Sequence, residues 1–283
     1  MTRPLDIAAS GIDGPARPTD GGARRTRSIP GWVTKPATLR MLSLLVVIGL
    51  WQLIGRNQPF SLSSPSAIVH AAFRDMHHEV LPAFGDTLKG FSLGFLICIL
   101  IGVPGGLLMA RSRIAELAFV PYVSALYATP RLALIPVLIL WFGLTFQMRL
   151  SVVIVSGLFP ILLNAYIGGK EVDRNMIEVG TAFAAGRLRI LHTIIVPGSL
   201  HYIFAGIRIG LGRALIGVIV AEIETSIIGV GNLISKDGAS LRIADMWVPI
   251  IMLGIFSIGC SIFLKWAERW TTMPWTRSRR VAV

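Results

Sequence analysis

Six long apolar runs, separated by shorter polar and charged segments, set the pattern of this chain. The runs cover residues 39–55, 88–110, 117–141, 149–168, 202–222 and 246–266. Each is near the roughly 20 residues that an α-helix needs to cross a bilayer. The pattern therefore predicts an all-α membrane protein with six transmembrane helices.

Several of these runs contain proline or glycine at interior positions, namely Pro104-Gly105-Gly106, Pro121, Pro130, Pro136, Pro160 and Pro249. Membrane helices tolerate such breaks where neighbouring helices or a cavity satisfy the freed backbone groups. Several broken helices together favour a transport pathway. Ordinary kinks that serve helix packing are the alternative.

The segment from Gly169 to Tyr202 is far more polar than the runs on either side. Its charged residues are Lys170, Glu171, Asp173, Arg174, Glu178, Arg187 and Arg189. A segment with this charge cannot lie in hydrocarbon, so the two flanking runs must end at the same membrane face. We expect an aqueous loop with helical content.

The remaining segments complete the domain organisation. Residues 1–38 are rich in proline, glycine and basic side chains, which predicts a disordered basic tail. The transmembrane domain then covers 39–270, with its central loop at 169–201, and a second basic tail covers 271–283. Ser64-Pro65-Ser66 predicts the start of a short surface helix, and residues 225–247 form a polar segment with glycine turn points.

Composition and charge support this picture. Apolar residues make up 53% of the chain, above the 45 to 50% or so of soluble domains, and the mean hydropathy is +0.69. The net charge of +12 comes from basic residues scattered over loops and tails, which does not indicate nucleic-acid binding. If the N-terminal tail is cytoplasmic, eighteen of the 27 basic residues lie inside and five outside. The positive-inside rule then places both termini and the central loop in the cytoplasm.

The chain shows no motif for catalysis or for a bound cofactor. Gly169-Lys170 is followed by Glu171 and so is not a phosphate-binding loop. Cys98 and Cys260 lie inside apolar runs, and the histidines near position 77 do not form a complete metal-ligand set. We therefore expect no metal, no cofactor and no enzymatic activity. Any ATP used in transport, with its magnesium ion, belongs on another chain.

The central loop resembles the EAA signature of binding-protein-dependent ABC importer permeases. Glu178 is followed nineteen residues later by Pro197, with apolar residues 194–196 just before it. The segments at 64–73, 94–113, 128–143, 159–168 and 206–222 are similar to the nitrate, sulfonate and taurine branch of these permeases. The resemblance implies the type I importer (MetI-like) fold in a prokaryotic inner membrane. It also implies a permease homodimer, a cytoplasmic ABC ATPase dimer and an external solute-binding protein that delivers an anion.

The loop departs from the family pattern at several positions. Val179-Gly180 follows Glu178 in place of two alanines, and Ala184 stands where the family has glycine, with Gly186 two residues later. We therefore expect a turn that is shifted or more helical. In the family, such a loop seats a short helix in a groove of the ATPase. Glu178 is the expected charged fixing point, and the expected apolar anchors are Val179, Phe183, Leu188 and Ile190.

Charged residues inside the runs are the second candidate set. A centrally placed arginine costs roughly 2.5 to 3.5 kcal/mol on insertion scales, so Arg208, Arg213 and Glu222 are expected to face protein or a water-filled cavity. Arg213 and Glu222 are about 13 Å apart on a straight helix and are unlikely to pair within one chain. We expect Arg213, together with Arg131 beside Pro130, to line the path of an anionic solute. A structural use of these arginines is the alternative.

Three other functions compete with an anion importer. A related permease for a vitamin precursor or an aromatic carboxylate shares the whole architecture. A stand-alone secondary carrier or channel is compatible with broken, charged helices, but it has no need for the central loop. A membrane-embedded enzyme is disfavoured because no paired carboxylates, histidine cluster or nucleophile share one run.

Overall fold

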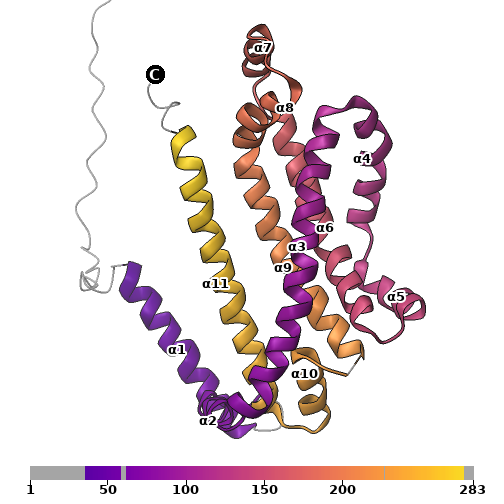
Figure 1. Cartoon of the computed structure of the whole chain (residues 1–283). Helices are drawn as coiled ribbons and strands as arrows, with labels where there is room; N and C mark the ends of the chain where they lie inside the picture. The colour runs from indigo at the N-terminus through magenta and orange to yellow at the C-terminus, as the bar shows by residue number, and fades with distance from the viewer. Residues whose placement is uncertain (1–35, 59–61, 226, 277–283) are drawn as a thin grey trace, which may run out of the picture. The chain divides into compact units, whose positions relative to one another are not determined.

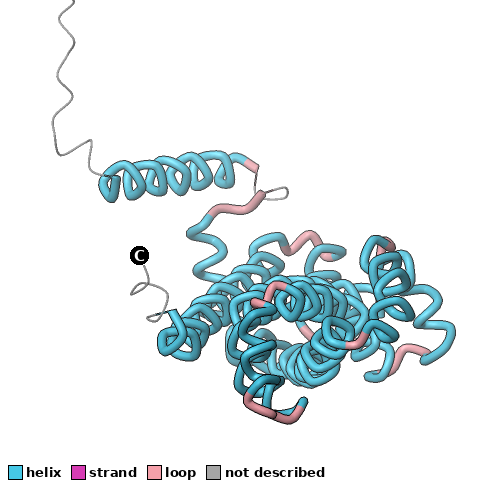
Figure 2. The backbone as a smooth tube through the Cα atoms, turned by 90° about the horizontal axis from the view of Figure 1, so that it is seen from above, coloured by secondary structure: helices cyan, strands magenta, loops and turns pink. Residues whose placement is uncertain are grey.

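A computed structural model describes residues 36–58, 62–225 and 227–276. The chain divides into two units, Met1–Val47 and Ile48–Val283. Most of the predicted N-terminal tail and the end of the predicted C-terminal tail lie outside the described residues. Helix accounts for nearly all of the described backbone, which contains no strand (Figure 2).

The helices are labelled in Figure 1. In chain order, they and the short 3-10 and π segments are α1 (Pro36–Asn57), α2 (Pro65–Asp75), η1 (Met76–Val80), α3 (Leu81–Arg111), α4 (Arg113–Ala128), η2 (Arg131–Leu134), α5 (Ile135–Phe142), α6 (Phe146–Lys170), α7 (Arg174–Ala182), α8 (Arg187–Ile190), η3 (Leu191–Ile195), α9 (Val196–Thr225), α10 (Val230–Ala239) and α11 (Ile243–Thr276). Ser64 caps the N-terminus of α2 by accepting a hydrogen bond from the Ala67 N–H at 3.4 Å, which confirms the predicted helix start.

Five helical segments are long and apolar enough to cross a membrane: Thr38–Asn57, Pro65–Arg111, Phe146–Lys170, Arg187–Thr225 and Ile243–Thr271. They contain five of the six predicted spans. The last of these helices continues to Thr276. Residues 271–276, predicted as the start of a tail, are therefore helical.

The remaining predicted span, 117–141, is a broken helix, as its interior prolines indicated. The helical stretches Arg113–Ala128 and Arg131–Phe142 meet at an angle of 94°. Together they count as a sixth membrane span only if the bent pair is taken as one. Pro130 causes the break, because the residue before a proline is pushed out of the helical region. Thr129 accordingly has φ −67° and ψ 137°, an extended conformation.

Two other prolines are accommodated without a break. Each π segment, η1 and η3, ends two residues before a proline, Pro82 and Pro197 respectively. A proline in a helix donates no hydrogen bond, and its ring clashes with the carbonyl four residues earlier. In the wider π turn an N–H bonds to the carbonyl five residues earlier, as the Val196 N–H does to the Leu191 carbonyl. The helices therefore continue through both prolines.

Within Ile48–Val283, the core of the bundle is formed by α3, α6 and α9, with α6 packed against both of the others (Figure 1). Glycines allow close approach at these contacts. A Cβ on Gly106 of α3 would clash with the backbone of α6, and one on Gly210 of α9 would lie 2.7 Å from Ile161. Such small-residue contacts are the usual basis of helix packing in membranes.

The two ends of this bundle carry different short helices. α7 and α8 lie at one end and α2 and α10 at the other (Figure 1). At the α7 end, Glu116 of α4 accepts hydrogen bonds from Tyr166 at 2.7 Å and Lys170 at 2.8 Å on α6. This cluster ties α4 to α6 close to the charged central segment.

Candidate functional site

The charged central segment folds into the short helices α7 and α8. Asp173 caps α7 by accepting a hydrogen bond from the Asn175 N–H at 2.9 Å. At the other end, the Ala184 N–H donates to the Thr181 carbonyl at 2.9 Å and the Ala185 N–H donates to the Gly180 carbonyl at 3.1 Å. These two bonds form a Schellman motif, a common way of ending a helix.

The Schellman motif places its left-handed residue at Ala184, which has φ +54°. The expectation of a shifted or more helical turn is therefore wrong. The turn lies where the family signature has glycine, and alanine adopts the conformation that glycine would favour. The surrounding hydrogen bonds override the preference of the side chain.

Glycine at Ala184 is expected to stabilise the protein. The left-handed conformation costs a residue with a Cβ roughly 1 kcal/mol, which corresponds to a rise of about 2 to 4 °C in the midpoint of thermal unfolding. Ala185→Gly is the matched control, because Ala185 does not have a positive φ, so glycine there only adds backbone freedom and removes a methyl group packed against the core, both of which lower stability. Thermal unfolding in detergent measures both variants. Equal midpoints for the two would contradict this explanation.

α7 and the start of α8 present apolar side chains to solvent. Val179 is 56% exposed, Phe183 84% and Leu188 74%. Met176, which the sequence analysis missed, is also exposed. It could have been found because positions 176, 179 and 183 follow the i, i+3, i+7 spacing of one helix face. Three of the four expected anchors are thus available to a partner.

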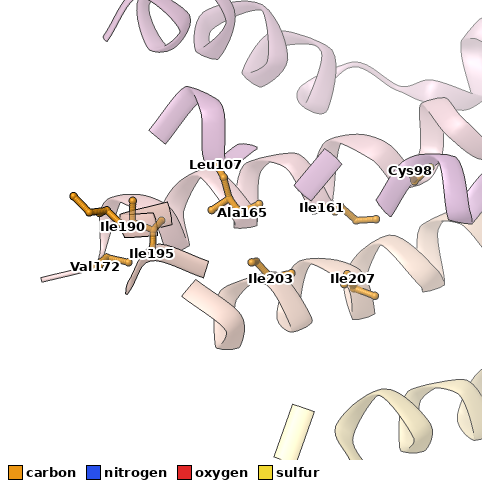
Figure 3. Close-up of a cluster of buried hydrophobic side chains, with 9 residues drawn as sticks. All are labelled: Cys98, Leu107, Ile161, Ala165, Val172, Ile190, Ile195, Ile203 and Ile207. Atoms are coloured by element: carbon orange, nitrogen blue, oxygen red, sulfur yellow. The ribbon is translucent and has the colours of Figure 1, made fainter. Parts of the chain in front are cut away.

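The fourth expected anchor, Ile190, is not available. It is 6% exposed and belongs to the buried cluster that also contains Val172 and Ile195 (Figure 3). Ile190 therefore holds the central segment to the bundle. The first turn of α8 presents Leu188 outward and turns Ile190 inward.

The other signature residues take structural positions. A Cβ on Gly180 would lie 2.9 Å from Ile194, so α7 lies close against η3. Gly186 is the residue before α8 and has open space around it. Pro197 is the second residue of α9, just after the π segment.

Glu178 is exposed and faces basic neighbours. It lines a cavity of about 340 Å³ together with Arg111 from the end of α3, Lys170 from the end of α6 and Arg174 of α7. The cavity therefore separates α7 from the ends of two long helices, and a carboxylate and three cations surround it.

A second cavity, of about 390 Å³, lies at the bend between α4 and η2. Arg131, Ser156 of α6 and Arg213 of α9 line it, together with residues 127–130. The structure thus brings the two arginines expected along the path to one place. Neither arginine has a carboxylate within 4 Å in the described part of the chain.

Arg131 is held rigidly in this cavity. Its guanidinium donates to the Tyr127 carbonyl at 3.0 Å and to the Ser156 carbonyl at 3.3 Å. It also stands 5.2 Å from the centre of the Tyr127 ring, an arrangement that stabilises a cation. Its Nε is buried and has no partner within the described residues. The bend at Pro130 is what brings this side chain against α6.

Arg208 and Glu222 lie elsewhere. Arg208 pairs with Glu268 of α11, which also binds His201 at 2.7 Å. Glu222 is fully buried and lies 3.5 Å from Arg149 of α6. Neither residue lines the cavity that contains Arg131 and Arg213. Each residue forms an ion pair between two helices, which is a structural role.

A network of ion pairs joins α10 to α2 and α11, and the sequence analysis missed it. Arg242 lies 2.6 Å from Asp245 and 3.6 Å from Asp237, and Arg74 lies 2.6 Å from Asp245. The hydrogen bond to Asp245 raises the pKa of Arg242. Burial raises the pKa of Asp237. These contacts fix the C-terminal end of α10.

No group of three or more metal-binding side chains is placed to hold a metal ion in the ranges that the structure describes.

Comparison with known proteins places the chain among transport components. Residues 102–272 match the family described as binding-protein-dependent transport system inner membrane component. A protein of Bacillus subtilis named as an aliphatic sulfonates transport permease, SsuC, is 29% identical over 82% of this chain and 86% of its own length. The formylaminopyrimidine transport permease ThiX of Halalkalibacterium halodurans is 28% identical over 86% and 96%. The nitrate import permease NrtB of Synechocystis is 22% identical over 87% and 93%.

Proposed function

Because the chain belongs to the family of binding-protein-dependent transport system inner membrane components, we propose that it is the membrane-spanning subunit of an ATP-driven importer. In this proposal a separate cytoplasmic ATPase supplies the energy and an external solute-binding protein delivers the cargo. Both termini and the α7 end of the bundle face the cytoplasm, in agreement with the positive-inside rule.

The observation that carries this proposal is the exposed apolar surface of the α7 segment, formed by Met176, Val179, Phe183 and Leu188. It lies at the end of the bundle on a segment too charged to enter the bilayer. An amphipathic helix with exposed anchors suits a groove on a partner protein. We identify this surface as the ATPase contact, with Glu178 as a charged fixing point at its edge.

A stand-alone carrier has no use for such a surface. The chain also lacks a phosphate-binding loop of its own, since Gly169-Lys170 is followed by Glu171. ATP and its magnesium ion therefore belong to the ATPase partner in this proposal. The surface converts movement of that partner into movement of α8 and α9, because Ile190 and Ile195 bury the segment's base in the bundle.

The translocation path follows from Arg213. This residue lies near the middle of the predicted span 202–222, yet its side chain is exposed in the single chain. A central arginine is too costly to face lipid and belongs against protein or water. We therefore propose that a second copy of the chain covers this face, so that Arg213 and Arg131 of each copy border a shared aqueous path.

The cargo that fits this path is a small anion. Two guanidinium groups line the cavity at the α4 bend, and the described residues that line it include no carboxylate. Sulfonate, taurine and nitrate carry the matching negative group. The similarity to ThiX keeps a vitamin precursor as the second candidate, and an uncharged pyrimidine would leave the two arginines without a counter-charge.

Affinity purification of the tagged protein from its native membrane, in a gentle detergent, tests the proposal. We expect an ABC ATPase and an external solute-binding protein to co-purify in stoichiometric amounts. ATP hydrolysis by the reconstituted complex should rise when the loaded binding protein is added. Purification of the chain alone, combined with solute uptake into vesicles without ATP, would overturn the importer assignment in favour of a secondary carrier.

A further inference from the structure

Helix α10 begins without a cap of its own. The residue before it, Gly229, has φ +93° and offers no side chain to the first turn. The first N–H groups of a helix have no partner within the helix and must find one elsewhere. In α10 two of these N–H groups, those of Val230 and Gly231, belong to buried residues, so water does not satisfy them.

Side chains from two other helices supply the missing partners. The Val230 N–H donates to the Thr87 hydroxyl at 2.9 Å, and the Gly231 N–H donates to a Glu222 carboxylate oxygen at 3.0 Å. The Thr87 hydroxyl donates in turn to the same Glu222 oxygen at 2.8 Å. α3 and α9 therefore cap α10 together, and the cap exists only while these two helices stay side by side.

A third helix balances the charge of this cap. Arg149 of α6 places its Nη1 3.5 Å from the second Glu222 oxygen, and both side chains are buried. A buried carboxylate without a counter-charge would be strongly destabilising. Arg149 thus offsets part of the cost of burying the Glu222 carboxylate, which accepts the hydrogen bonds from Thr87 and Gly231.

The glycines of the α10 start fit the carboxylate closely. A Cβ on Gly229 would collide with the carboxylate of Glu222, and one on Gly231 would lie 2.6 Å from the Glu222 Cβ. The backbone at the start of α10 therefore rests directly on the Glu222 side chain. The Glu222 side chain therefore sets the position of the first turn of α10.

We propose that Glu222 is a positioning residue that holds the start of α10 against α3, α6 and α9. We call this set of contacts the clasp, and α10 is released when the ends of α3 and α9 separate. The C-terminal end of α10 is held differently, by partly exposed ion pairs such as Lys236 with Glu79 at 3.6 Å. α10 is thus a strut between the bundle and the α2 and α11 pair. One further step rests on the importer proposed above. In that importer, the clasp couples the position of α10, on the external side, to the distance between α3 and α9.

Hydrogen exchange, followed by mass spectrometry on the purified protein in detergent, tests the clasp without any partner. Glu222→Gln should speed exchange in peptides covering residues 227–239 by about tenfold or more, since an amide replaces the carboxylate that accepts the hydrogen bonds from Gly231 and Thr87. Peptides covering residues 160–170 of α6, more than ten residues along the helix from Arg149, should be unchanged. Asp237→Asn makes the same chemical change within α10 but outside the clasp and should leave exchange at 227–233 unaltered.

Thr87 provides a second test that leaves the buried charges in place. Thr87→Val should also speed exchange at residues 227–233, whereas Thr87→Ser, which keeps the hydroxyl, should restore the original rate. Unchanged exchange in both Glu222→Gln and Thr87→Val, or an equal rise in Asp237→Asn, would overturn the clasp.

A separate measurement connects the clasp to transport. In the reconstituted complex, Thr87→Val should reduce the stimulation of ATP hydrolysis by the solute-binding protein severalfold, and Thr87→Ser should not. A stimulation that does not change would overturn the link to the spans while the exchange result stands. Failure to obtain any complex would instead count against the proposed function.

Discussion

Alanine in place of Phe183 is expected to lower ATP hydrolysis stimulated by the solute-binding protein by at least about tenfold, with no loss of folded protein. Phe183 is 84% exposed, so the free chain loses little when the ring is removed. An aromatic anchor buried in a partner's groove commonly carries about 2 to 4 kcal/mol of binding energy. That loss weakens the ATPase contact about 30-fold or more.

The matched control is Phe263→Ala, which removes another exposed aromatic ring from a different helix, α11. It should leave both the recovery of the ATPase and the stimulated hydrolysis unchanged. Size-exclusion elution of the chain alone shows whether each variant is folded. If Phe183→Ala retained the ATPase and its stimulation at wild-type levels, the α7 surface would not be the energetic contact.

Features that depend on local composition could be predicted from the sequence. Each span needs about 20 apolar residues in succession, and such runs are visible without knowing what they pack against. The same holds for the cap at Ser64, where hydroxyl and proline stand in adjacent positions. The central segment could be recognised for the opposite reason, because its charges exclude it from the bilayer.

Features that depend on packing could not be predicted in this way. Pro130 in an apolar run is compatible with a mild kink or with a full break of the helix. In the fold, the chain bends by 94° at this point and Arg131 contacts α6. Ile190 and Leu188 look equivalent as apolar residues of one loop, and their opposite burial reflects the face of α8 that meets the bundle.

The ion pair of Arg149 and Glu222 shows the same limit for charged residues. Arg149 stands at the edge of an apolar run, where an arginine normally reaches water and gives no sign of a buried partner. Its partner lies far away in the chain, and the pair forms because α6 and α9 pack side by side. The rise per residue correctly indicates that Arg213 and Glu222 are too far apart on one helix to pair. It gives no information about a partner on another helix.

Glutamine in place of Arg213 is expected to reduce uptake of the anionic cargo by tenfold or more while membrane insertion is preserved or improved. A central arginine costs roughly 2.5 to 3.5 kcal/mol on insertion scales, and the uncharged glutamine removes part of that cost. Its removal also leaves Arg131 as the single guanidinium that lines the cavity in each copy. Uptake of labelled sulfonate, taurine and nitrate into proteoliposomes, with the ATPase and binding protein present, measures the effect and ranks the cargoes.

Arg208→Gln is the control, because this arginine lies on the same helix, α9, but pairs with Glu268 and does not line the cavity. It is expected to lower thermal stability and to leave the cargo preference unchanged. Arg213→Lys keeps the charge but loses the planar fork that binds an oxyanion through two hydrogen bonds, so its uptake should fall between the wild type and Arg213→Gln. Anion uptake that is unaltered in Arg213→Gln, at equal expression, would show that this arginine serves only the contact between subunits.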